Sequence, residues 1–235
     1  MKAPLFYSKI LLFGEYGIIE DSKGLSIPFN FFKGGLRIGD MSELIEKESN
    51  LNLKKFRDYL LKIEISIVEF DFEKLNLDLN KGMFFDSSIP QGYGVGSSGA
   101  LVAAFYDRYA INKITVLENL TKSKILVLKN IFSMMESFFH GKSSGLDPLN
   151  SYLSLPILIH SKNEVETTGI PSLESKGKGA VFLLDSGKSS DTAPMVDLFF
   201  KSMKNKNYNK MIQEEFIKTT DNCVDDFLNG NFNSL

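Results

Sequence analysis

The pattern of hydrophobic and polar residues changes its period along the chain, and the changes predict a mixture of strands and helices. Alternation, as in residues 63–70, is typical of a half-buried strand, whereas apolar residues three and four positions apart are typical of an amphipathic helix. Glycine pairs such as Gly34-Gly35 predict turns between the first strands. Strands are predicted at residues 6–13, 18–19, 25–32, 63–70, 83–86, 152–161 and 180–185. Helices are predicted at residues 41–47, 53–61, 97–109 and 121–139, after Asp147, and over most of 193–228.

A glycine-rich segment leads into the helix predicted at residues 97–109. Residues 92–99 contain four glycines and two serines. Glycine permits positive φ and close approach of a ligand to the backbone, and the free N–H groups of a first helical turn attract anions. The segment therefore predicts a phosphate cradle, and an ordinary helix start capped by Ser97 or Ser98 is the simpler alternative.

Two known nucleotide-binding patterns do not account for this segment. The pattern G-x-x-x-x-G-K-[ST] is absent from it. Residues 94–99 fit G-x-G-x-x-G, but residues 87–91 separate them from the preceding strand, whereas the dinucleotide-binding pattern follows its strand directly. A nicotinamide-binding oxidoreductase therefore has little support.

Three polar residues have positions that suggest either structure or chemistry. Glu136 lies on the apolar stripe of the helix predicted at residues 121–139, where a carboxylate is costly to bury without a positive partner. A salt bridge to a lysine and a metal ion are both open explanations. Asp147 precedes Pro148 and is expected to cap a helix that begins with this proline, and His140 suits a helix C-terminus.

Composition limits the class of protein and its partners. The chain has 235 residues, 43% of them hydrophobic, and a net charge of −2, so it suits one large or two small globular domains. This charge balance lacks the excess of positive charge that is typical of nucleic-acid binding, and no basic amphipathic stretch suggests a membrane surface. No signal peptide or membrane span is predicted, and the single cysteine, Cys223, excludes an internal disulfide. We expect a cytoplasmic protein with a small-molecule partner.

Four separated segments, taken in order, resemble the motifs of the GHMP kinases, most closely those of the mevalonate kinases. They are residues 9–16, residues 90–100, Glu136-x-x-x-His140-Gly141-x-x-Ser144-Gly145-x-Asp147, and residues 185–187. The resemblance implies an α+β fold with two domains. The first, residues 1–175, would resemble domain 2 of ribosomal protein S5 and bind ATP. The second, residues 176–235, would be an incomplete ferredoxin-like domain.

The resemblance also assigns roles to residues. It makes Asp147 and Lys9 the catalytic pair at the acceptor hydroxyl, and Ser98 and Glu136 the ligands of Mg²⁺. It places Glu15, His140 and Thr192 on the substrate side. It assigns the ATP phosphates to the cradle residues Pro90, Gly92, Gly94, Val95, Gly96, Ser97, Ser98 and Gly99.

The activity that the resemblance implies is ATP-dependent phosphorylation of the primary hydroxyl of mevalonate, a step of isoprenoid precursor synthesis. His140-Gly141 and Ser144-Gly145 favour this substrate, whereas Glu15-Tyr16 also occurs in phosphomevalonate kinases, which with other GHMP kinases remain an alternative. The family's third glycine-rich motif is not found before Leu235, and Pro148 stands where asparagine is usual. We therefore expect an incomplete chain that is poorly stable or inactive as given, and a catalytically silent nucleotide-binding module is the alternative of another class. A monomer and a homodimer are both open.

Overall fold

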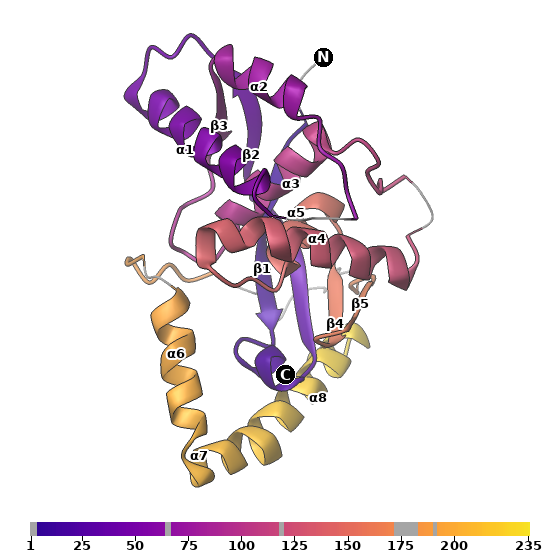
Figure 1. The fold of residues 1–235 in the computed structure, drawn as a ribbon. Helices are drawn as coiled ribbons and strands as arrows, with labels where there is room; N and C mark the ends of the chain where they lie inside the picture. The colour runs from indigo at the N-terminus through magenta and orange to yellow at the C-terminus, as the bar shows by residue number, and fades with distance from the viewer. Residues whose placement is uncertain (1–3, 64–66, 118–119, 172–182, 190–191) are drawn as a thin grey trace. The chain divides into compact units, whose positions relative to one another are not determined.

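The computed structural model describes residues 4–63, 67–117, 120–171, 183–189 and 192–235 (Figure 1). These residues contain five strands, β1 (Phe6–Phe13), β2 (Gly24–Ile38), β3 (Met83–Ser87), β4 (Ile157–Ser161) and β5 (Glu164–Thr167). The α-helices are α1 (Leu44–Leu60), α2 (Phe72–Asn80), α3 (Ser97–Tyr109), α4 (Lys122–His140), α5 (Leu146–Leu153), α6 (Thr192–Met203), α7 (Lys206–Met211) and α8 (Ile217–Leu228). Helices and an antiparallel sheet together confirm the predicted α+β class.

Strand β2 is the centre of the sheet. The strand order is β1-β2-β4-β5, and β3 also pairs with β2. The first residues of β2 pair antiparallel with β4, with Gly24 opposite Ile159. Its last residues pair antiparallel with β3, from Gly34 opposite Ser87 to Ile38 opposite Met83.

Gly34 and Gly35 lie inside β2, so the turn predicted there is wrong. A side chain at Gly34 would collide with the ring of Phe85 on the neighbouring strand, and a Cβ at Gly35 would lie 2.8 Å from the carbonyl oxygen of Pro4. Glycine in a strand interior often marks such a close approach. The two glycines therefore serve packing within the sheet.

The chain forms two compact units, which we describe separately. The first comprises residues 1–10, 28–90 and 95–154. In this unit α3 packs against α4 and α5, and α1 packs against β3 (Figure 1). Its core is aromatic, with the rings of Phe56 and Phe105 4.9 Å apart and those of Tyr106 and Phe132 5.1 Å apart. This packing fixes helix α3 on several sides.

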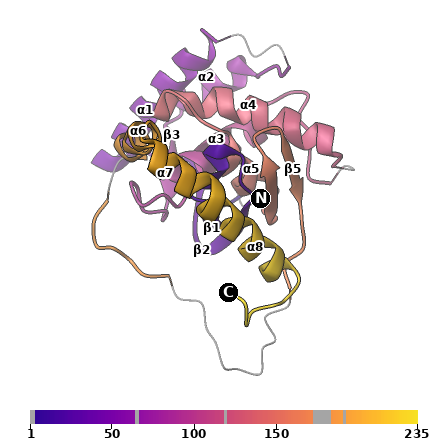
Figure 2. The ribbon, with the colours of Figure 1, turned by 90° about the horizontal axis from the view of Figure 1, so that it is seen from below.

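The second unit comprises residues 11–27, 91–94 and 155–235. Helix α7, a π-helical turn at Ile212–Phe216 and α8 form one continuous helical run (Figure 2). Its small core contains Leu25, Leu158, Val224 and Phe227. No helix in the described part of the chain is long and apolar enough to cross a membrane.

The helix predictions hold best where the apolar stripe is unbroken. The helix at 97–109 is confirmed by α3, and the helix at 121–139 by α4, which Thr121 caps by accepting a hydrogen bond from the Lys124 N–H. The helices predicted at 41–47 and 53–61 are instead the single helix α1. Polar residues between them interrupt the pattern, yet Asn50 is buried there and donates to the carbonyls of Leu79 and Met83 at 3.0 and 2.7 Å.

Several predicted strands are wrong or shorter. Residues 17–20 form a 3₁₀ turn, and α5 extends to Leu153, so the strand predicted at 152–161 begins only at Ile157. Within 63–70, residues 64–66 lie outside the described structure, and the described remainder contributes one isolated bridge, from Phe70 to Ala110. Residues 180–182 also lie outside it, and residues 183–185 are not a strand. Helix α2 and strand β5 were not predicted. The domain boundary at residue 175 falls outside the described residues and stays a prediction.

Candidate active site

Helix α3 begins at the glycine-rich segment, as its pattern predicts. Gly92, Gly94 and Gly96 all have positive φ, of 77°, 68° and 84°. Gly96 is the N-cap, and in the described structure no side chain caps the helix, so the alternative of a cap by Ser97 or Ser98 is wrong. The first N–H groups of a helix have no partner within the helix. They are therefore available to an anion.

Strand β1 lies against this helix start. The backbone N–H of Lys9 donates to the carbonyl of Val95 at 3.0 Å. A Cβ on Gly96 would lie 3.1 Å from Cγ of Lys9, so only a residue without a side chain fits easily there. The Lys9 side chain, which is buried, is thereby held beside the first turn of α3.

Lys9 forms an ion pair with Asp147, as the resemblance implies. Its Nζ lies 2.9 Å from Oδ1 of Asp147. Asp147 was expected to cap a helix beginning at Pro148, and this is wrong, because α5 begins at Leu146 and its N-cap is Gly145. The carboxylate, placed in the first turn, is free to face the lysine.

Two glycines fix the position of Asp147. A side chain at Gly145, where φ is 74°, would collide with the carbonyl of Lys129 on α4. A Cβ at Gly99 on α3 would lie 2.7 Å from the carbonyl carbon of Asp147. The first turn of α5 therefore sits tightly between α3 and α4.

Glu136 lies on α4 and is buried, with 3% of its surface exposed. Its two carboxylate oxygens accept hydrogen bonds from the hydroxyls of Ser98, at 2.9 Å, and Ser143, at 2.5 Å. Two hydroxyls therefore contact this buried carboxylate, and the charge of the nearby Lys9 also favours its ionised form. Nε2 of His140 also lies 2.9 Å from the Ser98 hydroxyl oxygen. Since that hydroxyl has one proton, which it donates to Glu136, the imidazole would donate through Nε2.

Burial raises the pKa of Glu136 to about 7. The nearby Asp147 carboxylate acts in the same direction, while the two serine hydrogen bonds and Lys9 oppose it. A proton or a cation would relieve this buried charge. Near neutral pH the site therefore has a carboxylate that gains from a bound cation.

The donors around Glu136 suit part of an Mg²⁺ coordination shell. Mg²⁺ prefers oxygen ligands and is usually bound by one or two carboxylates together with substrate phosphates and water. Ser98 and Glu136 offer such oxygens beside the start of α3. Among the described residues, no group of three or more His, Cys, Asp and Glu side chains could hold a metal ion.

The structure shows contacts among some of the predicted site residues and does not test the others. It brings Ser98, Glu136 and His140 together, and it pairs Lys9 with Asp147. Glu15 is exposed and belongs to the second unit. Thr192 begins α6 in that unit, and its side chain lies outside the described structure. Roles for these two residues stay predictions.

Sequence reasoning did not single out Ser143. Besides donating to Glu136, its hydroxyl accepts a hydrogen bond from the Gly145 N–H at 3.0 Å. It therefore links the carboxylate to the start of α5. The serine pair at 143–144 gave no signal for which hydroxyl faces Glu136, because the answer depends on the loop conformation.

Comparisons with known proteins agree with this fold. Residues 55–154 match the family described as GHMP kinases N terminal domain. The mevalonate kinase of L. major in complex with R-mevalonate is 16% identical, with a TM-score of 0.57, and the match covers 100% of this chain and 71% of that chain. The Methanococcus jannaschii mevalonate kinase is 18% identical, with a TM-score of 0.53 and coverage of 97% and 72%. A search of curated proteins finds no match. The fold is that of the GHMP kinases, and the resemblance to them, which in fold includes the mevalonate kinases, is confirmed.

Proposed function

We propose that this protein, which has the GHMP kinase fold, is an ATP- and Mg²⁺-dependent kinase that phosphorylates the primary hydroxyl of mevalonate. The observation that carries the proposal is the ion pair of Lys9 and Asp147, 2.9 Å apart, in the same unit as the bonded pair of Ser98 and Glu136. The four residues come from β1, α3, α4 and α5. Phosphoryl transfer needs positioned phosphates, a metal and a group oriented at the nucleophile, and this set could supply each.

The start of α3 would hold the phosphates. Pro90 and the cradle residues 92–99 provide a backbone with positive φ at three glycines and uncapped N–H groups in the first helical turn. Ser98 and Glu136 would hold Mg²⁺, which when bound neutralises charge on the phosphates. Ser143 keeps the Glu136 carboxylate oriented toward Ser98.

Asp147 and Lys9 would act at the acceptor hydroxyl. Asp147, about a third exposed, can accept or orient the hydroxyl proton, while the buried Lys9 ammonium provides positive charge beside it. Help from a general base of this kind is worth about 10²–10⁴ in rate. The backbone N–H of the same lysine donates to the cradle loop, so β1 contacts both the acceptor side and the phosphate side of the proposed site.

His140-Gly141 and Ser144-Gly145 support mevalonate as the acceptor, through the resemblance they carry. Glu15, His140 and Thr192 would bind this substrate. Phosphomevalonate is the second candidate because of Glu15-Tyr16. In the structure Tyr16 stacks on Phe199 at 5.3 Å between ring centroids, so its ring is engaged in packing within the second unit.

An assay of ADP release with each acceptor tests the proposal. The intact protein, with Mg²⁺ and ATP, should release ADP faster with mevalonate than with phosphomevalonate, and Asp147→Asn should abolish most of this difference. Faster release with phosphomevalonate would assign the second substrate. Mg²⁺·ATP binding by calorimetry without ADP release from either acceptor would instead support a catalytically silent module.

A further inference from the structure

A cavity in the first unit shares no residue with the proposed kinase site. It has a volume of about 360 Å³. One part of its lining is apolar and buried, and includes Phe6, Leu36, Ala104 and Ala110. The other part is charged, and consists of Lys74, Asp107, Arg108 and Lys113. The cavity is therefore amphipathic, with β1, β2 and α3 behind it and α2 at its edge.

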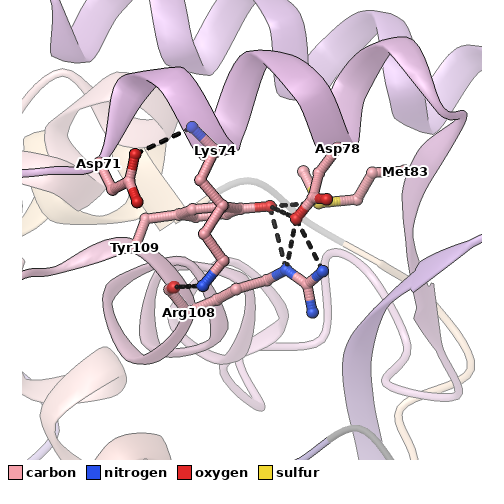
Figure 3. Close-up of polar contacts among 6 residues, drawn as sticks. All are labelled: Asp71, Lys74, Asp78, Met83, Arg108 and Tyr109. Atoms are coloured by element: carbon pink, nitrogen blue, oxygen red, sulfur yellow. Dashed lines mark hydrogen bonds and ion pairs between the residues drawn. The ribbon is translucent and has the colours of Figure 1, made fainter.

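Arg108 is held rigidly at this cavity. Its Nε and Nη2 donate to one carboxylate oxygen of Asp78 at 2.9 and 2.7 Å, and the hydroxyl of Tyr109 donates to the same oxygen at 3.0 Å (Figure 3). Burial, and next the Asp78 carboxylate, raise the pKa of Tyr109, so its hydroxyl stays a donor at neutral pH. Because Asp78 fixes one edge of the guanidinium, the arginine needs little reordering to meet a ligand.

Lys74 and Lys113 add positive charge to the lining. Nζ of Lys74 donates to the carbonyl of Arg108 at 3.0 Å and lies 5.7 Å from the centroid of the Tyr109 ring (Figure 3). Within the described residues it has no carboxylate partner. Lys113 is anchored to Asp107 at 2.8 Å. Among the described residues, these three cations form ion pairs with the carboxylates of Asp78 and Asp107, so the lining has more cations than carboxylates paired with them.

We propose that this cavity binds a small amphiphilic anion, with a carboxylate or phosphate head at Lys74, Arg108 and Lys113 and a short apolar body on Phe6 and Leu36. Ligand sites are typically concave, mostly apolar and oriented by a few polar groups, and cavities from about 300 Å³ upward hold small ligands. Charge-assisted hydrogen bonds to an anion are stronger than neutral ones. The proposal does not depend on the kinase activity.

Titration of the ¹⁵N-labelled chain by NMR tests this site with three probes. Hexyl phosphate and hexanoate distinguish a phosphate from a carboxylate head, and hexanol keeps the apolar body without charge. We expect one or both anions to shift the amides around Ala104, Ala110 and Lys113, and hexanol to bind at least about tenfold more weakly. Equal binding of hexanol, or shifts confined to residues 96–98 at the kinase site, would overturn the proposal.

Variants distinguish recognition of the anion's charge from nonspecific binding. The double change Lys74→Gln and Lys113→Gln should weaken anion binding by about tenfold or more, because it removes two cations and keeps Arg108 anchored to Asp78. Lys55→Gln, at an exposed position of α1, is the matched control and should bind as the unaltered chain does. An unchanged affinity in the double variant, shown by melting to be folded, would contradict the site. ADP release serves as the separate readout of the proposed kinase function, since these lysines are not in its site.

Discussion

At the scale of single residues, Glu136 combines two demands that usually conflict. It is a buried carboxylate, which costs folding free energy when ionised, and it is the group that a divalent cation would need in its ionised form. The serine hydroxyls of Ser98 and Ser143 lower the cost without supplying a positive charge. This compromise makes the residue sensitive to pH, to metal and to loss of its charge.

We expect Glu136→Gln to make the protein more stable at high pH relative to the unaltered chain. The pKa of Glu136 rises from 4.5 to about 7 on folding, so its contribution to stability is full below pH 4.5 and is lost as the pH rises toward 7. The loss amounts to about 3 kcal/mol at most. Urea unfolding at pH 5 and pH 8 should show a smaller fall for the variant. Glu48→Gln, at an exposed position, should change neither value.

The same Glu136→Gln change should weaken the Mg²⁺ dependence of ATP binding, because a neutral amide cannot balance a divalent cation. In the unaltered chain, Mg²⁺·ATP affinity should increase as the pH rises through 7 and the carboxylate ionises. Calorimetric titration at several pH values measures both effects. If the variant kept the full Mg²⁺ dependence, Glu136 would be a structural residue.

Asp147→Asn should lower kcat by about 10²–10⁴ with little change in ATP affinity. The substitution keeps the shape of the side chain and removes the charge that pairs with Lys9. Since Gly145 is the N-cap of α5, no capping bond is lost, but the buried Lys9 ammonium loses its ion-pair partner, so the variant should also be less stable. Turnover near that of the unaltered chain would remove Asp147 from the mechanism.

At the scale of elements, the junction of α3, α4 and α5 depends on residues without side chains. Gly145→Ala should destabilise the first unit by roughly 2 kcal/mol or more, because it adds both strain at positive φ and a collision with the backbone of α4. Gly141→Ala is the matched control, since φ there is 70° but nothing lies within 4 Å of the added Cβ. Chemical unfolding of both variants measures the difference. If both variants lost the same free energy of unfolding, the close packing at Gly145 would not contribute to stability.

The elements show how far sequence patterns predict this fold. Helix α3 was predicted at its observed ends because a glycine-rich start and an unbroken apolar stripe agree. Two helices were predicted where the structure has the single helix α1, because the polar Asn50 interrupts the apolar pattern. Asn50 is buried there because it donates to the carbonyls of Leu79 and Met83, and these contacts depend on tertiary structure. The turn at Gly34-Gly35 was wrong for a related reason, since the neighbour that requires glycine, Phe85, is far away in sequence. The resemblance to the GHMP kinases likewise implied the pairs at the site, but it did not identify the Ser143 hydroxyl.

At the scale of the whole molecule, the two units should differ in stability. The first has a large aromatic core, whereas the second has fewer buried apolar side chains among its described residues, with Leu25, Leu158, Val224 and Phe227 in one cluster. Regions with fewer buried contacts open at lower free energy. We therefore expect amides of β4 and α8 to exchange with solvent before those of α3 and α4.

Val224→Ala should speed exchange in β4 and α8 while leaving α3 to α5 protected. Val224 is fully buried, and losing its two methyl groups should cost roughly 2 kcal/mol. Hydrogen exchange followed by mass spectrometry measures the two regions separately. Met135→Ala, at a buried position of α4, should have the opposite distribution. Equal acceleration everywhere would show that the units unfold as one.

The pairing of β1 with residues far along the chain has a consequence during synthesis on the ribosome. Besides the ion pair of Lys9 and Asp147, the hydroxyl of Ser151 donates to the carbonyl of Tyr7 at 2.8 Å. Domains form as synthesis proceeds at about 5–20 residues per second, so β1 should wait on the order of ten seconds for these partners to emerge. Strand β1, which supplies Lys9, is synthesised early, but its contacts with α5 form late. A nascent chain arrested before α5 would therefore lack both the acid and a helix that packs against α3, so the site should form only after α5 has emerged.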